Sequence, residues 1–169
     1  ANNRELQPLS TRLLNRMNSA FRKFATDPKR VDALIDDLSG TAAKREVAII
    51  QMQSAGSVIL PQLLTRLHTT NDATLRTLIA NTLTRLGEQN IPALLGALLT
   101  PDANLRATVI GVIGRIGTKK DAVYLWYHAF GSDQSPGVQL AAREALARLL
   151  IGDVRRVDKI LSSSARGEL

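Results

Sequence analysis

One pattern occurs at residues 75–87 and again at residues 105–117, and it constrains the fold more than any other feature of the chain. Both copies have an early arginine (Arg76 and Arg106), a second arginine near the end and a terminal glycine. A weaker copy lies upstream at Arg45, which is 31 residues before Arg76, whereas Arg76 and Arg106 are 30 residues apart. A period of this length, within about 20–50 residues, is typical of stacked supersecondary units, each too thin to bury an apolar face alone. The sequence therefore predicts a repeat protein whose neighbouring units share one core.

Each copy has the apolar spacing of a helix, and no segment alternates polar and apolar residues over the length of a strand. Aromatic residues make up only 4% of the chain, so aliphatic side chains must fill the core, which suits helices. Long helices, each followed by a shorter partner, are predicted at residues 41–55, 72–87, 101–117 and 138–150. In the first of them Val47, Ala48 and Ile50 are expected to face inward. The prediction is ten helices in about five antiparallel pairs, an all-α chain with no β-sheet.

The two ends of the chain are expected to cap the repeats. Residues 8–24 have their apolar side chains on one helical face and basic side chains along its flank. Such a helix can lie on a membrane surface or dock into a groove, but an end cap is the commoner role in a repeat protein. We therefore expect capping helices over residues 1–40, repeats over 41–152, and a last capping helix with a frayed tail over 153–169.

The two clear copies contain, in the same order, an acidic residue, an aliphatic-arginine pair and an aliphatic-glycine end. These residues are Asp72, Leu75, Arg76, Leu86 and Gly87 in the first copy, with Ala80 as an added small residue, and Asp102, Leu105, Arg106, Ile116 and Gly117 in the second. This order resembles the HEAT repeat, in the variant also found in phycobilisome lyases, over about residues 41–152. The resemblance implies a right-handed α-solenoid whose second helices line a concave face. The last repeat departs from it, with Gln139 in place of the arginine and Leu150 in place of the glycine, and a disturbed register is expected there.

The charge balance leaves two kinds of partner open. The chain has 22 Lys and Arg against 15 Asp and Glu, a net charge of +7, without one dominant basic segment. A solubilising repeat surface explains this spread, and the alternative is a basic face that binds phosphate groups. No apolar run approaches the roughly 20 residues needed to cross a bilayer, so no membrane span is predicted.

The parts needed for catalysis or metal binding are scarce. The chain has two His and no Cys, no nucleophile-elbow motif and no glycine-rich loop after a strand. His68 has no evident companion acid or Cys, and His128 is assigned to the core. The likeness to lyases is one of scaffold only, and Asp121 near Tyr124 and Trp126 is a weak match to a helical-repeat DNA glycosylase. We therefore predict a non-enzyme without cofactor or metal.

Two sets of arginine recur through the repeats. Arg76 and Arg106 each lie four residues after an aspartate, a spacing that brings side chains together on one helical face. Structural ion pairs with Asp72 and Asp102, or with the acid of the next repeat, are therefore expected. The second set faces away from the first and lies in the last turn of the long helices, where the helix dipole favours a cation. It is either a set of helix-end stabilisers or a basic ridge for a polyanion, and its members are Arg85, Arg115 and Arg148.

The main candidate for a binding surface is the aromatic segment 124–128, which replaces residues 94–98 of the preceding repeat when the long helices are aligned. On this alignment Trp126 faces out and Tyr127 borders the groove, with cover of Trp126 by the loop at 131–137 or by the next repeat as the alternative. Exposed Trp and Tyr dominate the binding energy of many interfaces. The expected partner site has Trp126 and Tyr127 as anchors and Gln62, Thr65, Arg66, Ala93 and Gly96 as the groove floor. We predict a scaffold that binds a protein or peptide on its concave face, with nucleic-acid or polyanion binding as the alternative.

Overall fold

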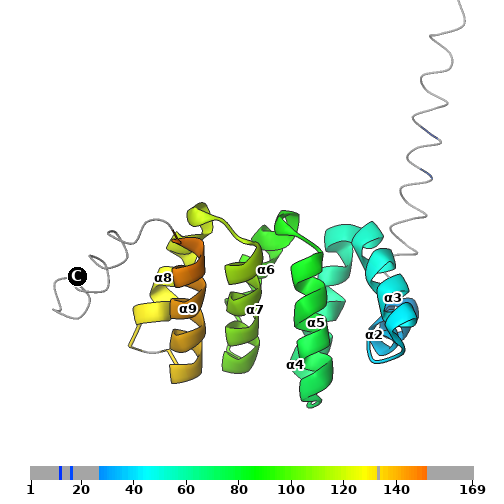
Figure 1. The fold of residues 1–169 in the computed structure, drawn as a ribbon, viewed down its shortest axis with the longest axis horizontal. Coiled ribbons are helices and arrows are strands. Elements are labelled where there is room, and N and C mark those ends of the chain that lie inside the picture. Colours follow the sequence, from blue (N-terminus) through cyan, green and yellow to red (C-terminus); the bar gives the residue numbers. More distant parts are fainter. Residues whose placement is uncertain (1–11, 13–15, 17–26, 133, 152–169) are drawn as a thin grey trace, which may run out of the picture. The chain divides into compact units, whose positions relative to one another are not determined.

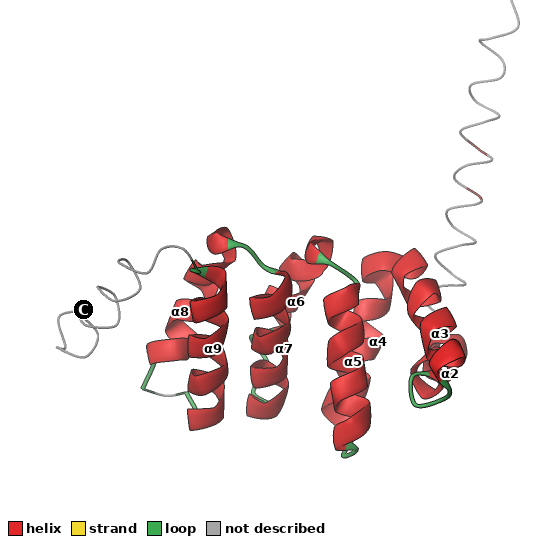
Figure 2. Cartoon of the chain, viewed as in Figure 1, coloured by secondary structure: helices red, strands yellow, loops and turns green. Residues whose placement is uncertain are grey.

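The computed structural model describes residues 12, 16, 27–132 and 134–151 of the chain. Regular structure within these residues is entirely helical, and they contain no strand (Figure 2). The predicted all-α class is therefore confirmed. Of the helix predicted over residues 8–24 only Arg12 and Arg16 are described, and both are helical and exposed; the capping helix predicted over 153–169 lies outside the described residues. The chain divides into two compact units, residues 1–62 and 63–169, and each is treated by itself below.

The first unit contains α2 (Pro28–Asp37), α3 (Ala42–Ala55), η1 (Gly56–Ile59) and the start of α4 (Leu60–Thr69). Asp27 begins α2 because its carboxylate accepts a hydrogen bond from the backbone N–H of Lys29 at 3.1 Å, with Pro28 in the first turn. Helix α2 packs against α3, and a hydrogen bond of 2.9 Å from Arg30 to Gln51 joins the two. These two helices form most of the described core of this unit, to which Ile59 and Leu60 add buried side chains.

The inward face of α3 differs from the prediction. Ala48 is buried as expected, but Val47 and Ile50 are 54% and 53% exposed. The buried residues are instead Ala48, Ile49 and Met52, a spacing of one and four residues that follows one helical face. The inward assignment of Val47 and Ile50 was therefore wrong, because the apolar residues of α3 lie on two opposite faces.

Residues Ala42–Thr69 are long and apolar enough, by length and composition alone, to cross a membrane. Gly56 interrupts this stretch in a backbone conformation with φ of 66° and ψ of −145°, which favours glycine. Met52, Leu63 and Leu67 are fully buried, so much of the apolar surface is already used in protein cores. The stretch is thus two helices joined at a glycine, and it is weak evidence for a membrane span.

The second unit continues from α4 and alternates long and short helices. Its elements are α5 (Ala73–Arg85), η2 (Glu88–Asn90), α6 (Ile91–Ala97), α7 (Ala103–Ile116), η3 (Lys119–Asp121), α8 (Ala122–Phe130) and α9 (Pro136–Leu149). The long helices α5, α7 and α9 pack in one row, and α6 and α8 lie behind it (Figure 1). Their boundaries agree with the predicted long helices to within two residues.

Each long helix in this unit begins at a side chain that accepts hydrogen bonds from the first backbone N–H groups. Asp72 caps α5 and Asp102 caps α7, each accepting from two amides at 2.8 to 3.2 Å. Ser135 caps α9 in the same way. A cap of this kind stabilises a helix by about 1 kcal/mol, so the starting point of every long helix is fixed locally.

The first arginine of each repeat binds backbone carbonyl groups, not the aspartates. Arg76 donates to the carbonyl of Thr70 at 3.3 Å, and Arg106 donates to that of Thr100 at 2.8 Å. Arg45 makes the equivalent bond to Leu38 at 2.7 Å. The predicted ion pairs with Asp72 and Asp102 were therefore wrong, because those carboxylates are occupied by helix capping. The guanidinium instead satisfies carbonyls at the end of the preceding short helix, which lack partners within that helix.

The last repeat keeps this interaction with a different residue. Gln139 donates its amide N–H to the carbonyl of Gly131 at 2.9 Å, where the other repeats use arginine. Arg143 adds a second bond, to the carbonyl of Ala129 at 3.1 Å. The expected disturbance of register does not occur here, since α9 is a regular helix that packs along α7 and α8.

Helices α7 and α9 come into close contact at Gly114. A Cβ atom on Gly114 would lie 2.5 Å from the Cβ and 2.7 Å from the Cα of Ala145. Both residues are buried, so the approach depends on the absence of a side chain at Gly114. Gly111, one turn earlier on α7, differs in that an added Cβ would meet nothing within 4 Å.

We expect Gly114→Ala to lower the free energy of unfolding by about 1–3 kcal/mol, because the new methyl group must push α9 away. Gly111→Ala is the matched control, since the same substitution on the same helix has room. It should leave stability unchanged or raise it by up to about 1 kcal/mol through better helix propensity. Urea denaturation followed by circular dichroism measures both, and equal effects of the two substitutions would contradict the close approach.

Candidate functional site

Helix α8 exposes more large apolar side chains than any other described helix. Its buried face consists of Ala122, Leu125 and Ala129. On the opposite side Val123, Tyr124 and Tyr127 are 69%, 56% and 55% exposed. We call these three residues the α8 stripe. They follow the spacing of one helical face, so a partner can contact all three at once.

The position of the stripe follows from the length of the loop that precedes it. Ile91 and Leu94 of α6, and Leu98 directly after it, are buried. The buried residues of α8, Ala122, Leu125 and Ala129, lie one position later than an alignment of the long helices α5 and α7 would place them. The segment from Gly117 to Asp121 has one residue more than the segment from Gly87 to Asn90. Equivalent residues are therefore 31 positions apart in the short helices α6 and α8, and 30 positions apart in the long helices α5 and α7.

This one-residue difference corrects the predicted orientation of the aromatic side chains. Trp126 takes the place of Leu95 and is half-buried, so the prediction that it faces outward was wrong. Tyr127 takes the place of the exposed Gly96 and is itself exposed. His128 is half-buried and not in the core, with its Nδ1 atom 3.4 Å from the Oε1 atom of Gln134.

Trp126 lies on the flank of α8 against a neighbouring ring. Its ring centroid is 4.5 Å from that of Phe130, one turn later, and the rings are tilted by 41°. The guanidinium of Arg143 lies 5.5 Å from the centroid of Phe130. Trp126 is thus partly covered by its own helix through Phe130. Its replacement would disturb packing as well as surface.

The other predicted partner-binding residues lie on two further helices. Ala93 and Gly96 are both exposed on α6, and an added Cβ at Gly96 would meet nothing within 4 Å. On α4, Thr65 is exposed and Arg66 half-buried. Gln62 is half-buried near the start of α4, within the first compact unit. The structure brings together Trp126 with Tyr127 and Ala93 with Gly96, and a single site formed by all of these residues stays a prediction.

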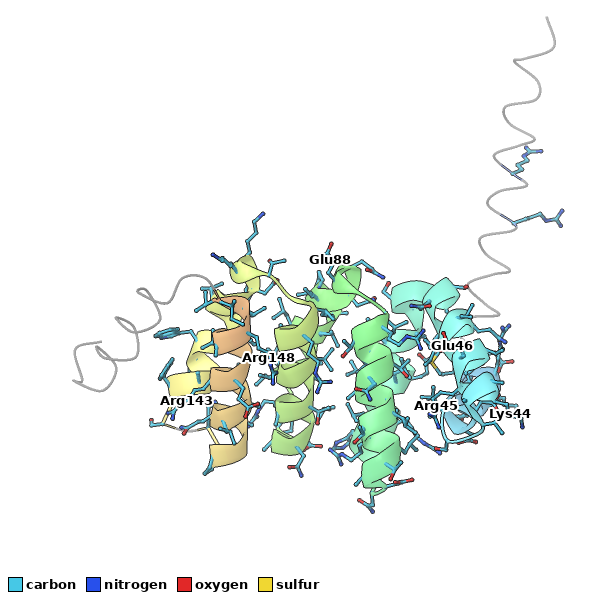
Figure 3. The ribbon with its side chains drawn as sticks, viewed as in Figure 1. Lys44, Arg45, Glu46, Glu88, Arg143 and Arg148 are labelled. Atoms are coloured by element: carbon cyan, nitrogen blue, oxygen red, sulfur yellow. The ribbon has the colours of Figure 1, made fainter. Side chains whose placement is uncertain are left out.

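The second set of arginines has the predicted position. Arg85, Arg115 and Arg148 are exposed in the last turns of α5, α7 and α9. Arg115 donates to the side-chain oxygen of Asn81 at 3.4 Å, and Arg148 lies 3.6 Å from Glu144 on its own helix (Figure 3). Their location at helix ends is confirmed, whereas a role in polyanion binding stays a prediction.

Basic residues precede the α8 stripe, and sequence reasoning did not assign them to a site. Lys119 and Lys120 are exposed in η3, which continues directly into α8. The carboxylate of Asp121 accepts hydrogen bonds from the backbone N–H of Thr118 at 2.7 Å and from its hydroxyl at 3.0 Å. Sequence reasoning also left out Val123 and Tyr124. The signal that could have found them is the alignment of Asn90 with Asp121, the residues just before the two short helices.

His68 has an acidic companion that the sequence did not reveal. Its Nδ1 atom lies 2.6 Å from Oδ2 of Asp102, at the start of α7. This hydrogen bond is the main cause that lowers the pKa of Asp102; burial raises that pKa, and the amides of Leu105 and Asn104 lower it further. The described part of the chain contains no group of three His, Cys, Asp or Glu residues that could hold a metal ion. The pair therefore joins α4 to α7 and does not form a metal site there.

Comparison with known proteins gives one match. A protein-family model described as HEAT repeats matches residues 60–160. No curated protein and no solved structure matches the chain.

We expect the hydrogen bond between His68 and Asp102 to make stability depend on pH in a defined direction. The pKa of Asp102 is lower in the folded chain than its ordinary value of 3.8, so the stabilisation is present above that pH. It is lost as the pH falls through the lower, folded-state pKa. Since the side chain of His68 is 56% exposed, the effect should not exceed about 1 kcal/mol.

Asp102→Asn tests this expectation because asparagine still caps the helix. The difference in unfolding free energy between the parent and Asp102→Asn, measured by urea denaturation, should shrink from pH 6 towards about pH 2. Asp72→Asn is the control, as it changes an equivalent cap without a histidine partner. A difference for Asp102→Asn that stays constant over this range, or that matches the control, would refute the assignment.

Proposed function

Because the chain belongs to the HEAT-repeat family, we propose that it is a non-catalytic scaffold that binds a protein partner. HEAT repeats are commonly protein-interaction scaffolds and are generally not enzymes. We place the partner on the face formed by the short helices, which in a HEAT stack is the concave one. We further propose that residues 41–152 act as the binding repeats and that the segments before and after them serve as caps.

The observation that carries this proposal is the exposure of the α8 stripe. Val123, Tyr124 and Tyr127 are each more than half exposed on one helical face. Tyrosine supplies a large contact area at low entropic cost and is enriched among the residues that dominate binding energy. In the preceding repeat the position of Tyr127 is held by Gly96. A side chain of this size at only one of two equivalent positions supports a role in recognition, since the repeat fold itself does not need it.

We propose that the remaining predicted residues receive the partner beside this stripe. Ala93 and Gly96 expose little side chain on α6, which leaves room for partner atoms. Thr65 and Arg66 on α4 supply polar groups at the rim, and we keep Gln62 in the proposed set. We keep the half-buried Trp126 in the site, with its ring packed against that of Phe130.

Polyanion binding by Arg85, Arg115 and Arg148 is the competing proposal. Its support is the net charge of +7 and the exposure of these three side chains at helix ends. Affinity for a polyanion should fall steeply with salt, because bound counterions are released. No retention of the chain on a heparin column at low salt would reject this alternative.

We expect Tyr127→Ala to weaken binding of the partner by about 30-fold, which corresponds to about 2 kcal/mol. The immobilised chain would be used to isolate its partner from a lysate of its own cells, and calorimetry with the purified partner would give the affinity. Tyr127→Ala is a cleaner test than Trp126→Ala, since Tyr127 is exposed and Trp126 packs on Phe130.

The matched control for this measurement is Leu140→Ala. Leu140 is a large apolar residue on α9 that is 61% exposed but lies outside the α8 stripe. Its replacement should change the affinity by less than about twofold. If Leu140→Ala weakened binding as much as Tyr127→Ala, or if neither had an effect, the α8 stripe would not be the contact surface.

A further inference from the structure

The exposed face of α8 extends backward into η3 and carries positive charge there. Asp121 has a right-handed helical conformation with φ of −82° and ψ of −15°, so η3 and α8 form a continuous helical path. Lys120 lies three residues before Val123 and four before Tyr124, and side chains at these spacings are neighbours on one face. Lys120 is exposed and forms no ion pair with any residue that the structure describes. A cation therefore stands at the start of the α8 stripe.

Two described carboxylates in the same part of the unit, those of Asp121 and Glu144, already have partners. The carboxylate of Asp121 is held by the two hydrogen bonds from Thr118 and completes a capping box. The carboxylate of Glu144 on α9 lies 3.6 Å from Arg148. Lys119 next to Lys120 adds positive charge before α8, and Arg143, labelled in Figure 3, adds it beside Phe130 at the other end. Among the described residues, cations near the stripe thus outnumber carboxylates.

Building on the proposed function, we propose that the partner segment recognised by α8 is acidic, with apolar side chains that cover the stripe. Lys120 would pair with a carboxylate, and Val123, Tyr124 and Tyr127 would contact the apolar side chains. Charge complementarity therefore favours an acidic segment over an uncharged apolar one, because an uncharged segment would leave Lys120 at the edge of the interface without an ionic partner.

The dimensions of the site set the spacing of the recognised residues. Lys120 and Tyr127 are seven residues apart, or about 10 Å along a helix axis. An extended peptide covers about 3.3 Å per residue, so its acidic and apolar residues should lie about three positions apart.

A protein segment fits this site better than nucleic acid does. Nucleic-acid binding needs a row of cations that follows several phosphates, and bases stack on aromatic rings. The stripe has lysines only at its start, and the aliphatic Val123 lies among its tyrosines. Arg115 and Arg148, on the long helices, already contact Asn81 and Glu144. A short segment that combines carboxylates with apolar side chains matches both parts of the site.

The chain contains its own reporter for this surface. Trp126 is the only tryptophan, and it lies next to Tyr127 on α8 with part of its ring accessible. A peptide bound on the stripe should change the emission of Trp126, whereas binding on another helix should not. This signal separates occupation of α8 from attraction to the whole cationic chain.

The experiment titrates the full chain with three synthetic peptides. Each has a Leu-Phe pair separated by about three residues from a run of Glu, of Gln or of Lys. We expect the Glu peptide to bind about tenfold more tightly than the Gln peptide, with a change in Trp126 emission, and the Lys peptide to bind most weakly. Lys120→Glu should lower the affinity for the Glu peptide about tenfold and raise the affinity for the Lys peptide. Tyr127→Ala should weaken the Glu and Gln peptides alike.

Lys44→Glu is the charge-matched control, because Lys44 is an exposed lysine on α3 (Figure 3). It lowers the net charge of the chain by the same amount and should leave the Glu peptide unaffected. Equal weakening by Lys44→Glu and Lys120→Glu would overturn the inference, since the attraction would then come from total charge.

The remaining outcomes separate the inference from the proposed function. If the Glu and Gln peptides bind equally and Lys120→Glu changes neither, while Tyr127→Ala weakens both, the acidic partner is refuted and the scaffold function stands. Binding of none of the peptides also refutes the acidic partner, and the experiment with the isolated cellular partner then decides the function. A single-stranded oligothymidylate is the last comparison. If it binds more tightly than the Glu peptide, and Lys120→Glu weakens its binding, the partner at this site is nucleic acid and not an acidic protein segment.

Discussion

The second unit depends on the burial of α7, a helix that is apolar around most of its circumference. Leu105, Val109, Ile110, Val112 and Ile113 are all buried, and they point in several directions around the helix. Such a helix is stable only with neighbours on more than one side. Helices α5 and α9 supply them in the same row and α6 supplies another, so the repeat that contains α7 needs a neighbour on both sides.

The close contact between α7 and α9 connects this core to the exposed surface. Gly114 and Ala145 let the two helices approach, and α9 in turn holds the buried face of α8. With Ala122, Leu125 and Ala129 fixed in that contact, the opposite side of α8 must face outward. The arrangement of Val123, Tyr124 and Tyr127 is therefore set by packing, and a partner would meet a surface that is already ordered.

Much of the fold could be predicted from the periodicity, because helices, their caps and the repeat length are determined by local sequence. The long helices predicted at 72–87 and 101–117 are present, and Asp72 and Asp102 cap them. The orientation of Trp126 and the contacts of Arg76 did not follow, since both depend on the loop before the helix and not on the periodicity of the helix itself. A single extra residue between Gly117 and Asp121 displaced the alignment, and the carbonyl bound by Arg76 belongs to a loop and not to a side chain. The link between His68 and Asp102 joins two distant repeats and has no local signature.

That extra residue has a consequence for how the protein can change. The linker at η3 takes up the added length, and the buried face of α8 keeps its phase against α9. The same insertion within α7 would turn every later side chain of that helix by about 100° and carry Gly114 away from Ala145. Homologous chains should therefore gain and lose residues at the linkers before short helices while the long helices keep a constant length. Insertions and deletions of this kind can change which side chains the short helices expose and leave the core intact.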